Sequence, residues 1–285
     1  MEEKALRLSA VFLMILTAVS FVLLPKLPAL HTWEVEAREE RIAEEEFAQS
    51  QVTMQNLKIK EQNEAAGAKG ELSIRLPEGV TGDQIAVSSD YVTQTIRVEI
   101  PQADRTYFDS YPVLGNSDYI DGLSYTRQGE TGVIEVTTNR VYELQTEYDT
   151  QNFYFNFLTP HEVYDKVVVI DAGHGGRAVG ANKQGINEKD IDLAIVLKLK
   201  EIFDNSDQNI GVYYTRTDDS NPTFDQRVQL ANKSDADLFI SIHNNSTRSG
   251  RMSGTSGTQV MYDETSEASR QFAQICLEEV TGRIG

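Results

Sequence analysis

The chain has 285 residues, with 44 acidic and 26 basic side chains and a net charge of −18. Nucleic-acid binding needs clustered lysine and arginine side chains that neutralise phosphates, so this charge argues against a nucleic-acid partner. The single cysteine excludes an intramolecular disulfide and a cysteine-based zinc site. The length is typical of two domains with accessory segments.

The N-terminal segment is apolar. Residues 8–24 form a nearly uninterrupted apolar run that follows Lys4 and Arg7. A membrane-spanning helix needs roughly 17 to 25 residues, and basic residues before such a helix favour a cytoplasmic N-terminus. We therefore expect residues 1–26 to be an uncleaved signal-anchor with a short cytoplasmic tail and the bulk of the chain to be extracytoplasmic. A cleaved signal peptide is the alternative.

Glutamate and other helix-forming residues dominate the segment 27–70, and apolar residues are sparse there. This composition predicts a solvated helical stalk that ends in a linker at residues 65–70. A disordered spacer is the alternative interpretation.

Residues 71–162 have a different pattern, in which apolar and polar residues alternate. The clearest alternating runs are residues 72–76, 95–100, 132–137 and 152–157. Period-two runs separated by Gly- and Pro-containing turns predict a small antiparallel β domain. No catalytic constellation stands out in this segment.

From residue 163 to residue 285 the pattern alternates between strand and helix. The predicted strands are residues 167–170, 211–215, 237–242 and 258–262, and the predicted helices are residues 188–204, 224–234 and 266–280. Such alternation predicts an α/β domain whose sheet is mostly parallel and is flanked by helices.

Two histidines follow predicted strands of this domain. His174 lies among glycines directly after the first strand, and His243 follows the strand 237–242. Zinc in hydrolases is held by three protein ligands drawn from histidines and carboxylates. Glu188, at the start of a predicted helix, is the best third ligand, with Asp171 and Asp190 as competitors. Asp171 could instead orient His174 without binding the metal, as a hydrogen-bond partner of the kind that metal-bound histidines usually have.

Five blocks of sequence occur in the C-terminal segment. In order they read Val-Ile-Asp-Ala-Gly-His174-Gly-Gly, Gly-Ile-Asn-Glu188-Lys-Asp, Tyr-Thr-Arg216-Thr-Asp-Asp, Arg227 with Ala-Asn232, and Ala-Asp-Leu-Phe-Ile-Ser-Ile-His243-Asn-Asn. Together the blocks closely resemble the zinc-dependent N-acetylmuramoyl-L-alanine amidases of the amidase 3 family over about residues 166–285. The preceding β segment resembles the small AMIN modules that precede some cell-wall amidases.

The resemblance implies an α/β fold with a mixed sheet and a Zn²⁺ ion held by His174, Glu188 and His243. It also implies a peptidoglycan hydrolase that uses zinc-activated water. The expected signal-anchor would hold this hydrolase at the cell membrane on the cell-wall side. Such an enzyme cleaves the amide bond between N-acetylmuramic acid and L-alanine. Arg216 and Arg227, together with Asn232, resemble framework positions of the family and are expected to hold the fold.

One family feature is missing from the sequence. Family members carry a further glutamate on a late strand, which acts as general base, and no matching segment occurs up to Gly285. The resemblance therefore implies that this base lies beyond Gly285 and that residues 163–285 are an incomplete catalytic domain. A non-catalytic cell-wall binding or regulatory protein is the alternative function, and a zinc peptidase acting on the stem peptide is a third.

Overall fold

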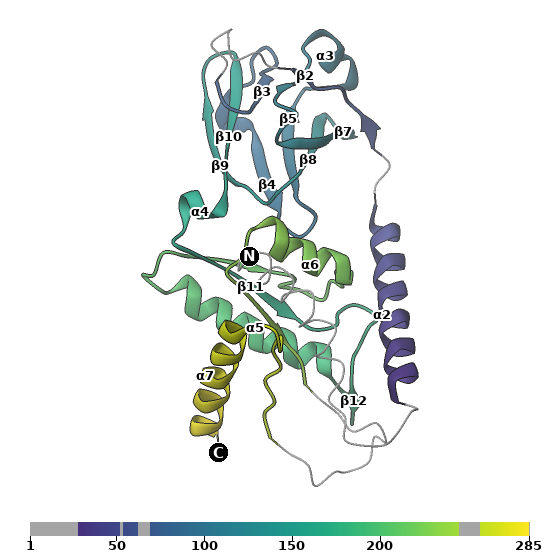
Figure 1. The fold of residues 1–285 in the computed structure, drawn as a ribbon. Helices are drawn as coiled ribbons and strands as arrows, with labels where there is room; N and C mark the ends of the chain where they lie inside the picture. The colour runs from purple at the N-terminus through teal and green to yellow at the C-terminus, as the bar shows by residue number, and fades with distance from the viewer. Residues whose placement is uncertain (1–27, 52–53, 62–68, 245–256, 285) are drawn as a thin grey trace.

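The computed structural model describes residues 28–51, 54–61, 69–244 and 257–284 (Figure 1). The expected signal-anchor, residues 1–26, lies outside these ranges. No helix in the described ranges is long and apolar enough to cross a membrane.

Two five-stranded sheets form the β domain (Figure 1). The first has the order β1 (Gln55–Asn56), β7 (Ile120–Gln128), β8 (Thr131–Thr138), β5 (Thr95–Pro101) and β4 (Ala86–Asp90). The second has the order β2 (Lys60–Glu61), β6 (Leu114–Gly115), β3 (Leu72–Arg75), β10 (Asn152–Leu158) and β9 (Glu143–Tyr148). All pairs are antiparallel except β2 with β6. Because β1 and β2 join these sheets, the β structure begins at Gln55, upstream of the residue 71 expected from the sequence.

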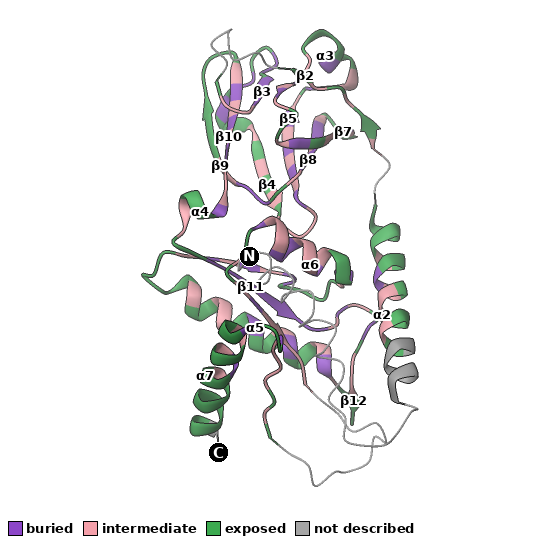
Figure 2. Cartoon of the chain, viewed as in Figure 1, coloured by how far each residue is buried: buried purple, intermediate pink, exposed green. Residues whose placement is uncertain are grey.

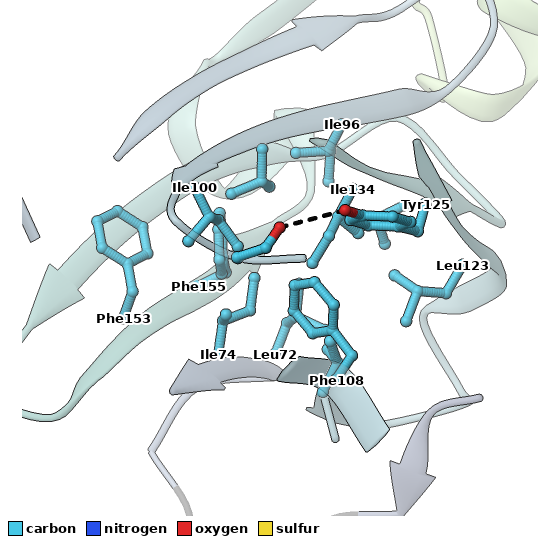
Figure 3. Close-up of a cluster of buried hydrophobic side chains, with 14 of the residues drawn as sticks. Leu72, Ile74, Ile96, Ile100, Phe108, Leu123, Tyr125, Ile134, Phe153 and Phe155 are labelled. Atoms are coloured by element: carbon cyan, nitrogen blue, oxygen red, sulfur yellow. Dashed lines mark hydrogen bonds between the residues drawn. The ribbon is translucent and has the colours of Figure 1, made fainter. Parts of the chain in front are cut away.

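One hydrophobic core lies within the β domain (Figure 3). Every second residue of β5 and β10 is buried, as the alternating sequence predicts. The core includes Phe155, Leu72 and Tyr125. The buried hydroxyl of Tyr125 donates a hydrogen bond to the Ala103 carbonyl at 3.2 Å. Burying each such large apolar side chain stabilises the fold by about 1.5–3 kcal/mol.

A parallel sheet of three strands forms the centre of the α/β domain. Its order is β14 (Ile210–Tyr214), β11 (Lys166–Ala172) and β15 (Leu238–Ile242). Helices α5 (Glu188–Asp204) and α6 (Phe224–Lys233) cover opposite faces. Alternate side chains of the central strand reach the two layers: Val168 and Ile170 pack with Val196 of α5, while Val167 and Val169 pack with Leu230 and Ala231 of α6. These contacts explain why β11 is a continuous apolar run.

The remaining helices connect or flank the two domains. They are α2 (Pro28–Ser50), α3 (Arg105–Ser110), α4 (Pro160–Val163) and α7 (Glu267–Ile284). Helix α7 is exposed along most of its length, whereas α2 lies against the α/β domain with one face covered (Figures 1 and 2).

Two details differ from the sequence-based expectations. Residues 258–262 pair with no other described strand, so the sheet is limited to three parallel strands among the described residues. The sequence also predicts that Ile191, Ile195, Leu199 and Ile202 form the buried stripe of helix α5. In the structure Ile195 and Ile202 are 40% and 65% exposed, whereas Asp192 and Val196 are fully buried. The buried face of the helix therefore also includes two carboxylates one turn apart, those of Glu188 and Asp192.

Glu143 of β9 joins the two domains. Its carboxylate accepts hydrogen bonds from Tyr213 of β14 at 2.6 Å and from Tyr91 at 3.0 Å. The rings of Tyr91 and Tyr213 pack edge to face, with their centroids 4.9 Å apart. The β domain therefore packs directly on the layer of the sheet that α6 covers.

Candidate metal centre

A tight glycine-containing loop displays His174 at the carboxyl end of β11. His174 itself has φ of 57°, in the left-handed region, which costs about 1–3 kcal/mol for a residue with a side chain. A Cβ atom on Gly173 would lie 2.4 Å from the His243 ring, and one on Gly180 would lie 2.6 Å from the His174 ring. Glycine at these two positions allows the backbone to approach both imidazoles.

A two-residue hairpin places Glu188. Strands β12 (Asn182–Lys183) and β13 (Ile186–Asn187) are antiparallel, and Gln184 and Gly185 between them both have positive φ. This turn geometry matches the twist of a tight hairpin. Helix α5 starts directly after the hairpin, with Asn187 at its N-cap position. Glu188 thus lies at the first position of the helix, beside the loop that carries His174.

The three side chains predicted as metal ligands lie together. His174 Nε2 lies 3.3 Å from Glu188 Oε2, and His243 Nδ1 lies 3.2 Å from Glu188 Oε1. The two histidine nitrogens, His174 Nε2 and His243 Nδ1, are 3.2 Å apart. The lone pairs of two neutral imidazoles repel at this distance, so the arrangement needs a proton or a cation between them.

Asp192 is a fourth member of the cluster that the sequence analysis missed. Ligand atoms of His174, Glu188, Asp192 and His243 all lie within 4.8 Å of one another. The Asp192 Oδ1 atom accepts a hydrogen bond from the Asn244 amide at 2.7 Å, whereas Oδ2 is buried without a partner. Its position one helical turn after Glu188 is the sequence signal that could have revealed it.

The charges in the cluster perturb its titration. Burial alone would lower the pKa of His174, but hydrogen bonds and charges from Glu188 and Glu39 raise it to about 10. Burial alone would raise the pKa of Glu188, but hydrogen bonds from both histidines hold it well below its usual range. Burial raises the pKa of Asp192 to about 7, and the nearby charge of Glu188 adds to that effect. Strong perturbation of several groups in one place is typical of a functional site.

The donor set fits a zinc ion. Two imidazole nitrogens and carboxylate oxygens converge from three elements, and the Asp192 Oδ2 atom has no protein partner. Imidazole and carboxylate are ligands that zinc accepts in catalytic sites.

Two arginines fix the loop that carries His174. Arg216 donates to the Gly173 carbonyl at 2.6 Å and to the Ala172 carbonyl at 2.9 Å. Arg227 donates to the His174 carbonyl at 2.8 Å and to the Ala172 carbonyl at 2.7 Å. Both arginines are buried, and these contacts give them the framework role expected from the sequence.

The expected role of Asp171 is wrong in this structure. Its carboxylate pairs with Arg227 and accepts hydrogen bonds from Thr215 and Ser241, and it has no hydrogen bond to His174. The backbone explains the difference, because the side chain of Asp171 lies on the α6 side of the sheet end, where the buried guanidinium needs a counter-charge. Asp190 also stays outside the cluster and bonds to the Asn187 amide at 2.8 Å.

Helix α2 contributes a contact that no sequence pattern indicated. Glu39 Oε2 lies 3.1 Å from His174 Nδ1, on the ring atom that does not face the cluster. The expectation of a wholly solvated stalk over residues 27–70 is therefore corrected: α2 is helical, but one face packs against the site.

The fold and the site define an α/β domain with a candidate metal centre of two histidines and two carboxylates at the carboxyl edge of its sheet. Residues 168–285 match the family model described as N-acetylmuramoyl-L-alanine amidase. This match agrees with the resemblance to the amidase 3 family that the sequence blocks indicated.

Individual relatives agree with this assignment. The endolysin of Bacillus phage SPP1 is 45% identical over 86 residues, which are 30% of this chain and 31% of that protein. The N-acetylmuramoyl-L-alanine amidase CwlM of Bacillus licheniformis is 34% identical over 113 residues, which are 40% of this chain and 43% of that protein. The chain thus spans less than half the length of these two relatives.

Among solved structures, the catalytic domain of the N-acetylmuramoyl-L-alanine amidase CwlV from Bacillus (Paenibacillus) polymyxa var. colistinus aligns at 38% identity. The alignment covers 39% of this chain and 59% of that one, with a TM-score of 0.35.

Proposed function

We propose that this chain is a zinc-dependent N-acetylmuramoyl-L-alanine amidase that hydrolyses peptidoglycan. The observation that carries the proposal is the convergence of His174, Glu188 and His243 within one segment that matches this family. The relatives named as amidases support the substrate class.

His174 Nε2, His243 Nδ1 and the Glu188 carboxylate would hold the zinc ion. A zinc ion bound there supplies a Lewis acid that polarises the amide carbonyl and lowers the pKa of water to about 7. The side chains of His174 and Glu188 are only 13% and 8% exposed, which limits competing water around the ligands.

Asp192 adds a second carboxylate beside the ligands. Its Oδ2 atom is buried without a hydrogen-bond partner, so it would be free to bind the ion or to accept a hydrogen bond beside it.

Hydrolysis of purified peptidoglycan tests the proposal. The zinc-loaded protein, tested together with any sequence that follows Gly285, is expected to release stem peptides whose new N-terminus is L-alanine, and a chelator is expected to stop the release. A His243→Ala variant should be inactive, whereas His161→Ala, on α4 and outside the cluster, should keep wild-type activity. Absence of release by that zinc-loaded protein would contradict the amidase proposal. Peptidoglycan binding without release would instead support the non-catalytic alternative, and peptides lacking L-alanine would support a stem-peptide peptidase.

We also propose the domain division and the location from the sequence. Residues 1–26 would anchor the chain in the cell membrane, with the AMIN-like segment 71–162 and the amidase segment 163–285 on the cell-wall side. The chain should then sediment with membranes and resist extraction at alkaline pH, and deletion of residues 1–26 should release it. Unchanged fractionation after the deletion would contradict the anchor.

A further inference from the structure

One face of helix α2 is covered by the α/β domain. Ala43 on this face is 2% exposed, and Glu39, Glu40 and Glu46 are half-buried around it. These residues follow the spacing i, i+1, i+4 and i+7, which places them on one side of a helix. Glu44, in contrast, is exposed.

The acidic side chains of this face have specific partners on loops around the site. Glu40 accepts the backbone N–H of Phe224 at 2.8 Å, at the first residue of α6. Glu46 accepts the backbone N–H of Arg177 at 2.9 Å and the Asn221 amide at 3.0 Å. A Cβ atom on Gly176 would lie 2.5 Å from the Glu46 carboxylate, so glycine leaves the space that this contact occupies. Helix α2 is thus held by specific hydrogen bonds to the start of α6 and to Arg177 and Asn221.

Glu39, the residue before Glu40 in the helix, contacts His174 directly. The two nitrogens of the His174 ring have separate partners: Nδ1 lies 3.1 Å from Glu39, and Nε2 faces Glu188 and His243. Glu39 therefore lies on the opposite side of the imidazole from the atoms that converge on the candidate metal position.

We propose that Glu39 is a positioning residue for the metal centre. With Nδ1–H donating to the Glu39 carboxylate, the neutral ring keeps its Nε2 lone pair directed at the metal. A carboxylate partner of this kind fixes the tautomer and orientation of a metal-bound histidine and increases its basicity. Asp171 cannot do this, because Arg227, Thr215 and Ser241 occupy its oxygens. The inference rests on the proposed zinc function and makes α2 part of the metal centre.

Zinc affinity, measured by competition with a chelator of known affinity at fixed pH, tests this role. Loss of such a partner typically weakens metal binding about 10- to 100-fold, so the zinc affinity of Glu39→Ala should be lower than that of wild type by a factor in that range. Glu39→Gln keeps an oxygen acceptor without the charge and should recover part of the affinity. Glu44→Gln, an exposed change on the same helix, is the control. Its zinc affinity should stay within about twofold of wild type, a smaller change than the loss of a histidine partner causes.

A second variant separates orientation of His174 from seating of the helix. Glu46→Ala removes contacts to Arg177 and Asn221 but leaves Glu39 in place, so its loss of zinc affinity should be smaller than that of Glu39→Ala. The visible absorption spectrum of the cobalt-substituted protein should change with Glu39→Ala and not with Glu44→Gln, because only Glu39 contacts a ligand.

Several results would overturn the inference. Unchanged zinc affinity in Glu39→Ala, or equal losses in Glu39→Ala and Glu46→Ala, would show that Glu39 does not orient His174. Tighter zinc binding and faster peptide release in Glu39→Ala would show that α2 covers the site rather than completing it. Failure of the wild-type chain to bind zinc would instead contradict the proposed function itself, so the two failures are distinguishable.

Discussion

Arg227 and Asp171 form a buried ion pair beneath the loop that carries His174. Their side chains are 3% and 2% exposed, and the same guanidinium also donates to the carbonyl oxygens of Ala172 and His174. The same ion pair therefore stabilises the carboxyl end of β11 and fixes the backbone position of His174.

Removing the charge of Asp171 should destabilise the fold. An Asp171→Asn variant leaves the Arg227 guanidinium buried without a counter-charge, which typically costs about 3–5 kcal/mol. We expect a loss of this size in the free energy of unfolding, measured in urea. Asp190→Asn, an exposed change on α5, is the control and should lie within about 0.5 kcal/mol of wild type. A loss below about 1 kcal/mol in Asp171→Asn would contradict the structural role assigned to the pair.

The contribution of the same pair should depend on pH. Burial alone would raise the pKa of Asp171, but the Arg227 charge and the hydrogen bonds from Ser241 and Thr215 lower it to about 2. A depressed carboxyl pKa stabilises the folded state above the unfolded value of 3.8, and that stabilisation is lost as the pH falls through 2. The difference in stability between wild type and Asp171→Asn should therefore be constant at neutral pH and shrink below pH 4. A difference that grows on acidification would refute this assignment.

Space for the His243 ring depends on Gly173. A Gly173→Ala substitution would bring Cβ to 2.4 Å from that ring, so the His243 ring or the loop must shift from its present position. We expect zinc affinity to fall by about tenfold or more, the scale seen when ligand orientation is disturbed. Gly122→Ala in β7, where the nearest atom would be 3.7 Å away, is the matched control. Wild-type zinc affinity in Gly173→Ala would show that His243 is free to bind from another position.

The junction between the two domains depends on Glu143. The Glu143→Ala variant lacks the carboxylate that accepts hydrogen bonds from the hydroxyls of Tyr213 and Tyr91. An unpaired buried polar group costs about 1–3 kcal/mol of stability. We predict a decrease of that order in the free energy of unfolding. Glu147→Ala, exposed on the same strand, should have little effect. Equal stability of the two variants would mean that the tyrosine contacts do not stabilise the junction.

The local sequence predicted the strands that carry the site. The four consecutive β-branched residues of β11 and the apolar run of β15 are typical of strands in a parallel sheet, and a histidine follows each strand within two residues. The predicted helix 188–204 likewise has the observed bounds of α5, which places Glu188 at its start. These features depend on neighbours in the sequence, so the sequence reveals them.

Contacts between distant segments were not predictable in the same way. Glu39 and His174 are 135 residues apart in the sequence. The glutamate-rich sequence of α2 is also typical of a solvated helix, so it does not indicate which glutamates have partners. Asp171 was assigned to His174 because they are close in sequence, but a strand directs its side chains to opposite faces, and Arg227 was the partner on that face. Asp192 was assigned to no role because the isoleucines of α5 suggested a different buried face.

The central claim is that His174, Glu188 and His243 together hold one zinc ion, and the metal content of the purified protein tests it most directly. We predict one zinc ion per wild-type chain after dialysis against zinc-free buffer, and little or none in His174→Ala, Glu188→Ala and His243→Ala, with His161→Ala unchanged. One zinc ion per chain in all three ligand variants, or none in the wild-type chain after zinc loading, would contradict the account.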